Sequence, residues 1–205
     1  LATFNGARYL REQLDSLCCQ DYPHVRIRVR DDGSTDDTLA VLKEYAARHA
    51  NLEVEAGKRI GVVRSFFELL RAVPEDVALD AFCDQDDVWE PDKISRAVER
   101  LTDVDESIPR LYLGRMKIVD ENLLPVGETA RPRQPPALQN ALVQAIAAGC
   151  TMVLNRAAHK LLACNLPDPN RVVMHDWWIY QVISALGVVE YDDQPHILYR
   201  QHQSN

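Results

Sequence analysis

Hydrophobic and polar positions along the chain follow the helical period in some segments and the strand period in others. Between residues 10 and 18 the apolar positions recur every three or four residues, so they predict a helix with Asn5 as its N-cap. Every second residue from 25 to 29 is apolar, which predicts a strand with one polar face. The two periods keep alternating, and this arrangement predicts a sheet covered by helices.

The rest of the chain supplies further elements of both kinds. They are helices over 39–46, 62–73, 137–148 and 176–186, a helix with Pro91 in its first turn, and strands over 52–56, 79–83, 111–119 and 150–154. Residues 125–136 hold four prolines and one glycine, so they predict an irregular loop.

Length and composition favour one globular domain. The chain has 205 residues, of which 46% are hydrophobic, enough for a buried core. We expect a single domain over 1–205, with one half over 1–103 and the other over 104–205. The sequence has no initiator Met and opens at what looks like the end of a strand, so we expect a piece of a longer chain.

The charge of the chain excludes one class of partner. Its 23 Lys and Arg residues against 31 Asp and Glu residues give a net charge of −8, which argues against a nucleic-acid binder held by phosphate contacts. No apolar run reaches the roughly 20 residues of a membrane-spanning helix, and residues 1–6 lack the regions of a signal peptide. We therefore expect a cytoplasmic protein.

Acidic side chains follow several of the expected segments, at 31–32, at 84–87 and at Asp176. Ligands of open α/β sheets bind at the carboxyl ends of strands, so these clusters meet if the sheet is largely parallel. Asp84 and Asp86 are two residues apart and leave an extended backbone on the same face. Such carboxylates suit a hard divalent cation completed by phosphate oxygens. The structural alternative is a solvated acidic loop beside the cap of the next helix.

Several short strings occur together in a recognisable order. They are ATFNG at 2–6, RDDGSTD at 30–36, FCDQDD at 82–87 followed by Pro91, GCT at 149–151, HDWW at 175–178 and YRQH at 199–202. Together they resemble the family 2 glycosyltransferases over essentially the whole chain. The DQDDVW, HDWW and YRQH strings resemble, more narrowly, bacterial rhamnosyltransferases of surface polysaccharide synthesis.

The resemblance implies the GT-A fold, a single α/β domain with a central, mostly parallel mixed sheet and a Rossmann-like nucleotide-binding half. It implies a UDP- or dTDP-linked sugar donor and Mg²⁺ or Mn²⁺ as cofactor. In the family, the places of Phe4 and Asp32 contact the nucleobase, and the place of Asp84 lies near the ribose. Arg59 is a candidate for the base or the diphosphate.

The resemblance also assigns the metal and the chemistry. Asp86 falls at the second carboxylate of the DxD motif, which meets the metal, and His202 falls where a late histidine often completes the metal site. Asp176 falls at the general base of an inverting displacement. His175 precedes it where the family commonly has Glu, so the histidine is a competing candidate for the base.

Contacts to the sugar or acceptor complete the implied site, and they fall at Gly149, Cys150, Thr151 and Trp177. We expect a glycan or lipid-linked acceptor, reached by peripheral association with the inner face of the membrane. A carboxylate at a helix N-terminus has its charged form stabilised, which predicts a lowered pKa for Asp176.

Each residue also has a structural interpretation, and other functions compete. Phe4 suits a core, Asp31 and Asp32 suit a turn before Gly33, and Asp176 suits a helix cap. A nucleotidyltransferase would also use clustered carboxylates, but it should show a glycine-rich basic loop near the N-terminus. A non-catalytic nucleotide-sugar-binding module is the other alternative. A dinucleotide dehydrogenase is disfavoured because the chain has no GxGxxG string.

Overall fold

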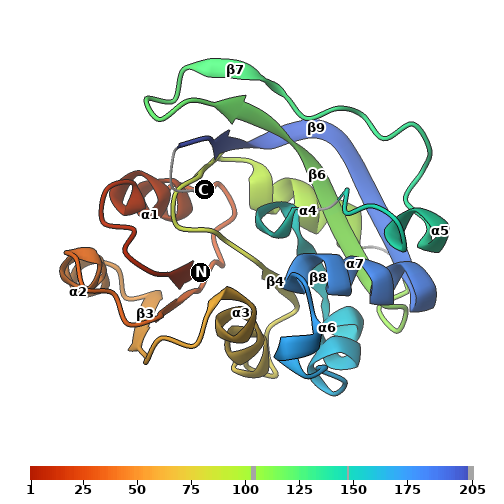
Figure 1. Cartoon of the computed structure of the whole chain (residues 1–205), viewed down its shortest axis with the longest axis horizontal. Helices are drawn as coiled ribbons and strands as arrows, with labels where there is room; N and C mark the ends of the chain where they lie inside the picture. Colours follow the sequence, from red (N-terminus) through yellow and green to blue (C-terminus); the bar gives the residue numbers. More distant parts are fainter. Residues whose placement is uncertain (103–104, 147, 203–205) are drawn as a thin grey trace.

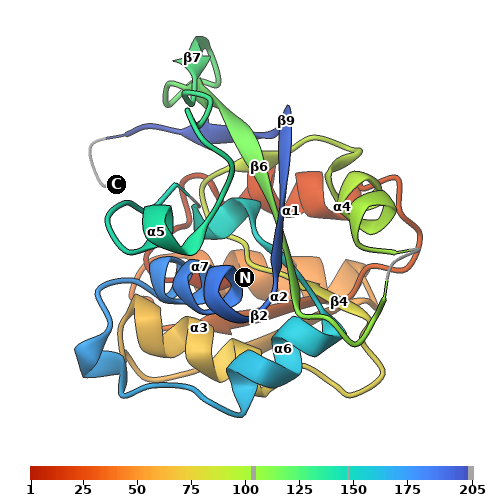
Figure 2. The ribbon, with the colours of Figure 1, turned by 90° about the vertical axis from the view of Figure 1, so that its right-hand side faces the viewer.

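Helices and strands alternate through the chain and build three layers, with helices on both sides of the strands (Figures 1 and 2). The computed structural model describes residues 1–102, 105–146 and 148–202. The predicted boundary between the halves, at 103 and 104, lies outside the described residues. The elements are β1 (Ala2–Thr3), α1 (Leu10–Cys18), β2 (Ile27–Asp31), α2 (Thr38–Arg48), β3 (Leu52–Ala56), α3 (Val62–Arg71), β4 (Leu79–Ala81), β5 (Val88–Trp89), α4 (Lys93–Leu101), β6 (Arg110–Val119), β7 (Pro125–Glu128), α5 (Leu138–Ala141), η1 (Gly149–Thr151), β8 (Val153–Asn155), α6 (Arg156–Ala163), η2 (Pro169–Arg171), α7 (His175–Leu186) and β9 (Val188–Arg200).

The strands form two sheets rather than one central sheet. The first has the order β1-β2-β3 with parallel pairs, and the second has the order β4-β8-β6-β9-β5, with β7 added at β6. In the second sheet only the β6–β9 pair is parallel. The prediction of mixed α/β architecture is confirmed, whereas the predominance of parallel strands holds only for the first sheet.

Apolar side chains on both faces of β6 pack against helices and so hold the layers together. Leu111 and Leu113 pack with α3, α6 and α7, whereas Tyr112 between them packs with Ala97 and Leu101 of α4. Side chains alternate across a strand, so β6 buries both faces. A third cluster joins α1, α2 and β2 and also includes Cys150 and Ile197 from the C-terminal half. Figure 1 shows α1, α2 and β3 on the left, and β6, β8 and β9 on the right, with β4 between them.

Several local predictions differ from the structure. The strand expected over 150–154 begins only at Val153, because Gly149–Thr151 form the short helix η1. The helix expected over 137–148, which includes the undescribed residue 147, is helical only over α5. Leu142 and Val143, which follow α5, are 61% and 79% exposed, so a longer helix would gain little burial from them. Part of the expected loop over 125–136 forms the exposed edge strand β7, where proline is tolerated as the first residue.

The N-cap of α1 and the long strand β9 also differ from the sequence-based expectation. Asn5 does not cap α1; it has a φ of +49° and accepts a hydrogen bond from the Thr35 N–H. The strand β9 has 13 residues, and the sequence pattern did not indicate it because Asp192, Asp193 and Pro195 interrupt the apolar alternation. Its pairing with β6 shifts register in that stretch, which accommodates the interruption.

Candidate active site

The acidic clusters meet where β1 and β2 end, beside the segment that follows β4. The Asp32 N–H donates to the Thr3 carbonyl at 2.7 Å, and the Ala2 N–H donates to the Cys83 carbonyl at 3.4 Å. These bonds bring the residues that follow each strand to one edge. The sequence predicted that residues following parallel strands would meet at one edge of the sheet, and the parallel β1–β2 pair confirms this for its part of the sheet.

Phe4 is held at this edge by a reciprocal pair of hydrogen bonds. Its N–H donates to Oε1 of Gln85 at 2.8 Å, and Nε2 of Gln85 donates to the Phe4 carbonyl at 3.1 Å. The ring is half-buried, and the Arg59 guanidinium lies 4.3 Å from its centroid. Gln85 also approaches Gly6 so closely that a Cβ there would lie 2.2 Å from its Oε1. The two predicted nucleotide residues, Phe4 and Arg59, are thus in contact.

Asp32 is buried and already accepts several hydrogen bonds. Its Oδ1 accepts from Nη1 of Arg30 at 2.7 Å and from the Ile60 N–H at 2.8 Å, and its Oδ2 accepts from the Gly61 N–H at 2.8 Å. Burial raises the pKa of Asp32, but the Arg30 guanidinium and the two backbone N–H groups outweigh burial and hold this pKa below its usual value. Asp31 caps the turn by accepting from the N–H groups of Gly33 and Ser34.

Asp84 and Asp86 lie together with residues from distant parts of the chain. Oδ2 of Asp86 is 2.9 Å from Nε2 of His202, although 116 positions separate the two residues. Burial, then the negative charges of Asp86 and Asp176, raise the pKa of Asp84 to about 7. The structure therefore brings the predicted metal pair, the predicted ribose carboxylate and the predicted base into one electrostatic group.

A second group of possible ligand atoms shares Asp84 with the first and includes two buried residues. Each of Asp84, Asp87 and Cys150 offers one ligand atom, and these three atoms lie within 4.8 Å of one another. Burial raises the pKa of Asp87 and of Cys150 well above their usual values. A neutral thiol is a soft, weak ligand, so this group suits Mg²⁺ or Mn²⁺ less well than the Asp86–His202 pair. Lys93 is also buried there, 3.7 Å above the Trp89 ring, and burial lowers its pKa to about 8.

Asp176 lies in the first turn of α7, where both carboxylate oxygens accept backbone hydrogen bonds. Oδ2 accepts from the Gly149 N–H at 3.0 Å and Oδ1 from the Trp177 N–H at 2.7 Å. The prediction of a lowered pKa is wrong, because burial raises the pKa of Asp176 by more than these hydrogen bonds lower it. The carboxylate is a stronger base than the helix terminus alone would make it.

His175 has the surroundings of a core aromatic rather than of a base. It is 2% exposed, its ring stacks on Phe66 at 4.0 Å, and neither ring nitrogen has a hydrogen-bond partner among the described residues. Burial lowers the pKa of His175 to about 3. The neighbouring carboxylate is therefore the better candidate for the base.

The predicted sugar and acceptor residues separate into two sets. Gly149, Cys150 and Thr151 form the short helix η1 and are all buried; the Gly149 N–H reaches the site through its bond to Asp176, and Cys150 through its proximity to Asp84. Trp177 is half-buried, and its Nε1 donates to the Ala141 carbonyl at 2.7 Å, which ties α7 to α5.

The reasoning from sequence assigned no role to two residues of the site. Gln85 and Arg200 both lie inside the recognised strings, in DQDD and YRQH, and their positions were the available signal. Gln85 joins the acidic loop to Phe4, and Arg200 donates to the carbonyl oxygen of Asp86 at 2.7 Å.

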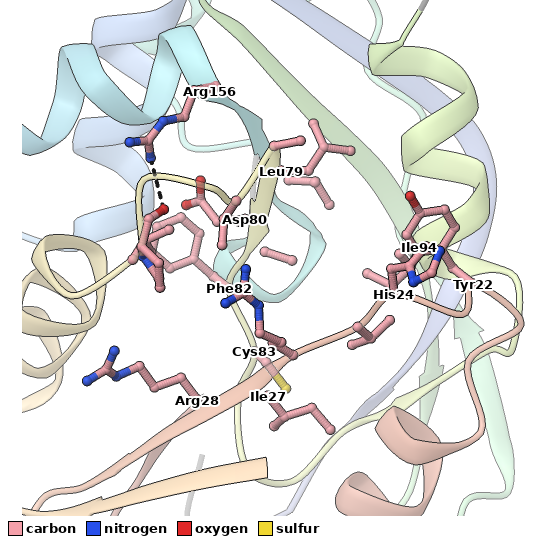
Figure 3. Close-up of a pocket in the computed structure, with 18 of the residues that line it drawn as sticks. Tyr22, His24, Ile27, Arg28, Leu79, Asp80, Phe82, Cys83, Ile94 and Arg156 are labelled. Atoms are coloured by element: carbon pink, nitrogen blue, oxygen red, sulfur yellow. Dashed lines mark hydrogen bonds between the residues drawn. The ribbon is translucent and has the colours of Figure 1, made fainter. Parts of the chain in front are cut away.

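A cavity of about 800 Å³ lies elsewhere, between β2 and β4 (Figure 3). Ile27 and Arg28 of β2 face it from one side, and Leu79 and Phe82 face it from the other. None of the predicted site residues lines this cavity. The candidate active site is therefore the acidic edge and not the cavity.

Comparisons with known proteins agree with this geometry. The family model described as Glycosyl transferase family 2 matches residues 1–162. The chain is 28% identical over 220 residues to the dTDP-rhamnosyl transferase RfbG of Shigella flexneri, covering 100% of this chain and 72% of RfbG.

Solved structures show the same fold. TarS 1–349 of S. aureus in complex with UDP-GlcNAc has a TM-score of 0.73 at 18% identity, covering 100% of this chain and 58% of that one. The mannosyltransferase PcManGT of Pyrobaculum calidifontis, in complex with GDP-Man and Mn²⁺, has a TM-score of 0.67 at 22% identity, covering 98% of this chain and 55% of that one. This chain thus spans little more than half the length of either solved protein, and the predicted GT-A fold is confirmed.

Proposed function

Because the chain belongs to glycosyl transferase family 2, we propose that it transfers a sugar from a nucleotide-diphosphate sugar to an acceptor hydroxyl, with inversion. The observation that carries the proposal is the convergence of Asp84, Asp86 and Asp176 in one electrostatic group. Phe4 and Asp32 lie at the same edge, where the nucleotide would bind.

For the donor we propose a UDP- or dTDP-linked sugar, with rhamnose as the first candidate. The similarity to a dTDP-rhamnosyl transferase supports this choice. Phe4 would stack on the base, and Arg59, which lies on the Phe4 ring, would contact the base or diphosphate. Asp32, which is held by Arg30 and the N–H groups of Ile60 and Gly61, would accept a hydrogen bond from a base imide N–H. Asp84 would bind the ribose.

The Asp86–His202 pair would hold Mg²⁺ or Mn²⁺. Its carboxylate oxygen and imidazole nitrogen lie 2.9 Å apart; the carboxylate is the kind of ligand that these ions prefer, and the histidine would complete the site as the family resemblance implies. Burial, then the repelling negative charges of Asp86 and Asp176, raise the pKa of Asp84. A bound cation would relieve that repulsion, so the residues fit the ion. When bound, the cation neutralises charge on the diphosphate leaving group.

Asp176 would act as the general base. The acceptor oxygen forms a bond to the anomeric carbon, the bond from that carbon to the diphosphate oxygen breaks, and its electron pair leaves with the diphosphate. The acceptor proton passes to the Asp176 carboxylate. Gly149 and Trp177 hold this carboxylate in place through their N–H groups.

For the acceptor we propose a glycan or a lipid-linked glycan of surface polysaccharide synthesis, reached at the inner face of the membrane. Among the described residues, no helix is both long and apolar enough to cross a bilayer. We propose peripheral association as the mode of contact. Leu142 and Val143, which are exposed after α5, are candidate contacts.

The experiment is a thermal-shift panel of UDP-, dTDP- and GDP-linked sugars with and without Mn²⁺, followed by transfer assays with the sugars that bind. A sugar at 100 times its dissociation constant should add about 2.7 kcal/mol to the free energy of unfolding. We expect the shift to need Mn²⁺ and to be lost in Asp86→Asn.

Asp92→Asn is the matched control, because Asp92 Oδ1 lies 2.9 Å from Nδ1 of His196 in a similar carboxylate–histidine pair outside the site. It should keep the Mn²⁺-dependent shift. Equal binding with and without Mn²⁺ would contradict the metal-dependent proposal. Binding without transfer would favour the nucleotide-sugar-binding module, and transfer of a nucleotidyl group would favour the nucleotidyltransferase.

A further inference from the structure

The two residues of the proposed metal pair lie 116 positions apart in the chain. Asp86 lies in the loop between β4 and β5, whereas His202 lies beyond Arg200, the last residue of β9. The backbone pairing with β6 continues one residue past β9, where the Gln201 N–H donates to the Val119 carbonyl at 2.9 Å, but this bond does not fix the side chain of His202. Its distance of 2.9 Å from Asp86 therefore needs another constraint.

Arg200 supplies direct contacts to the acidic loop. Its backbone N–H donates to Oδ1 of Asp87 at 3.1 Å, and its Nε donates to the carbonyl oxygen of Asp86 at 2.7 Å. The residue is 1% exposed. One buried residue therefore joins the end of β9 to the two aspartates.

The same guanidinium also reaches two other segments. Its Nη1 donates to the Glu121 carbonyl at 2.7 Å, in the loop after β6, and its Nη2 contacts the Glu12 carboxylate on α1. The planar fork has fixed donor directions, so these contacts set the orientation of all three segments at once. A lysine, with a single ammonium on a flexible stem, cannot reproduce them.

Tyr9 completes the arrangement. The Arg200 guanidinium lies 4.4 Å from the centroid of the Tyr9 ring, and the His202 ring lies 4.8 Å from it at an angle of 33°. The tyrosine thus packs against both the arginine and the histidine. Groups that orient metal ligands from behind commonly change metal affinity 10- to 100-fold when they are altered.

We propose that Arg200 is a positioning residue that holds Asp86 and His202 in the geometry that binds the divalent cation, and that it thereby sets the affinity for that cation. The inference rests on the proposed function, since it takes the Asp86–His202 pair as the metal site.

The test is direct titration of Mn²⁺ alone into the full chain, by calorimetry and by the electron paramagnetic resonance signal of free Mn²⁺. Arg200→Lys should raise the Mn²⁺ dissociation constant about 10- to 100-fold. Excess Mn²⁺ should restore transfer in this variant, so that kcat recovers while the metal concentration for half-activity stays high.

Arg115→Lys is the matched control. Arg115 is another arginine of the second sheet with a side chain only 11% exposed, but its Nε and Nη2 donate to the Thr129 carbonyl and its carboxylate partners are Glu128 and Asp193. It should lower stability comparably and leave the Mn²⁺ affinity unchanged. Glu12→Gln removes the half-exposed carboxylate partner of Arg200 and should weaken Mn²⁺ binding several-fold, which keeps the test decisive if Arg200→Lys fails to fold.

Two failures are distinguishable. If Asp86→Asn binds Mn²⁺ as the wild type does, the proposed metal site is wrong. If Asp86→Asn loses Mn²⁺ while Arg200→Lys, or Glu12→Gln in its place, stays within twofold of the wild type, the metal site stands and the positioning role of Arg200 is overturned.

Discussion

Replacing Asp176 by asparagine tests the chemistry of the site with little change of shape. The carboxylate accepts from the Gly149 N–H at 3.0 Å and the Trp177 N–H at 2.7 Å. Asparagine offers one carbonyl oxygen, so one of these N–H groups loses its acceptor, at a cost of about 1–3 kcal/mol. Removal of a buried charge offsets part of that cost. We therefore expect Asp176→Asn to fold.

Transfer should fall much more than binding in Asp176→Asn. Loss of a general base typically lowers the rate by roughly 10² to 10⁴, whereas the nucleotide would bind at Phe4, Asp32 and Asp84 and keep its affinity. The measurements are the single-turnover transfer rate with saturating donor and Mn²⁺, and calorimetric titration of the nucleotide. In the wild type, transfer should decline as pH falls through the raised pKa of Asp176.

The same carboxylate contributes a pH-dependent stability whose sign follows from its raised pKa. The folded state favours the protonated acid, so its contribution is fully present below the unfolded pKa of ~3.9 and is lost as pH rises through the folded pKa. The unfolding free energy of the wild type minus that of Asp176→Asn should therefore decrease as the pH rises from about 4 through the raised pKa of the folded state. Urea unfolding at several pH values measures this difference.

Asp80→Asn provides the control for a buried carboxylate outside the site. Burial also raises the pKa of Asp80, which lies 3.2 Å from Nδ1 of His159 and lines the cavity of Figure 3. It should show a similar pH-dependent difference and unchanged transfer. Wild-type transfer by Asp176→Asn, together with loss of transfer in His175→Gln, would refute the assignment of the base.

Three further predictions concern stability and nucleotide binding. Gly187→Ala should lower the unfolding free energy by about 1–3 kcal/mol in urea, because its Cβ would lie 2.2 Å from the Pro109 carbonyl oxygen, whereas Gly127→Ala, with no atom within 4 Å of the added Cβ, should not. Lys93→Met should remove a stability gain that the wild type shows between about pH 8 and pH 10.4, because the unfolded chain binds more protons than the folded one in that window. Phe4→Leu should weaken UDP or dTDP binding in calorimetry by about 1–3 kcal/mol, the usual worth of a base stacked on an aromatic ring, and an unchanged affinity would exclude Phe4 from the base site.

Sequence alone determined the features that depend on neighbours along the chain. The apolar spacing of α1 and the alternation in β2 are set by the helical and strand periods, so both elements were predictable. The order of the short strings indicated the family and most of the candidate site residues. Phe4, Asp84, Asp86, Asp176 and His202 were all named from those strings.

Tertiary structure decided everything that depends on what covers a residue or lies opposite it. The helix terminus predicted a lowered pKa for Asp176, but desolvation by the surrounding protein raises it, and desolvation cannot be read from neighbours in sequence. The strand β9 forms despite its interrupted apolar pattern because β6 supplies its hydrogen-bond partners. Likewise, the contact between Asp86 and His202 spans 116 positions and exists only because the chain folds back on itself beside Arg200.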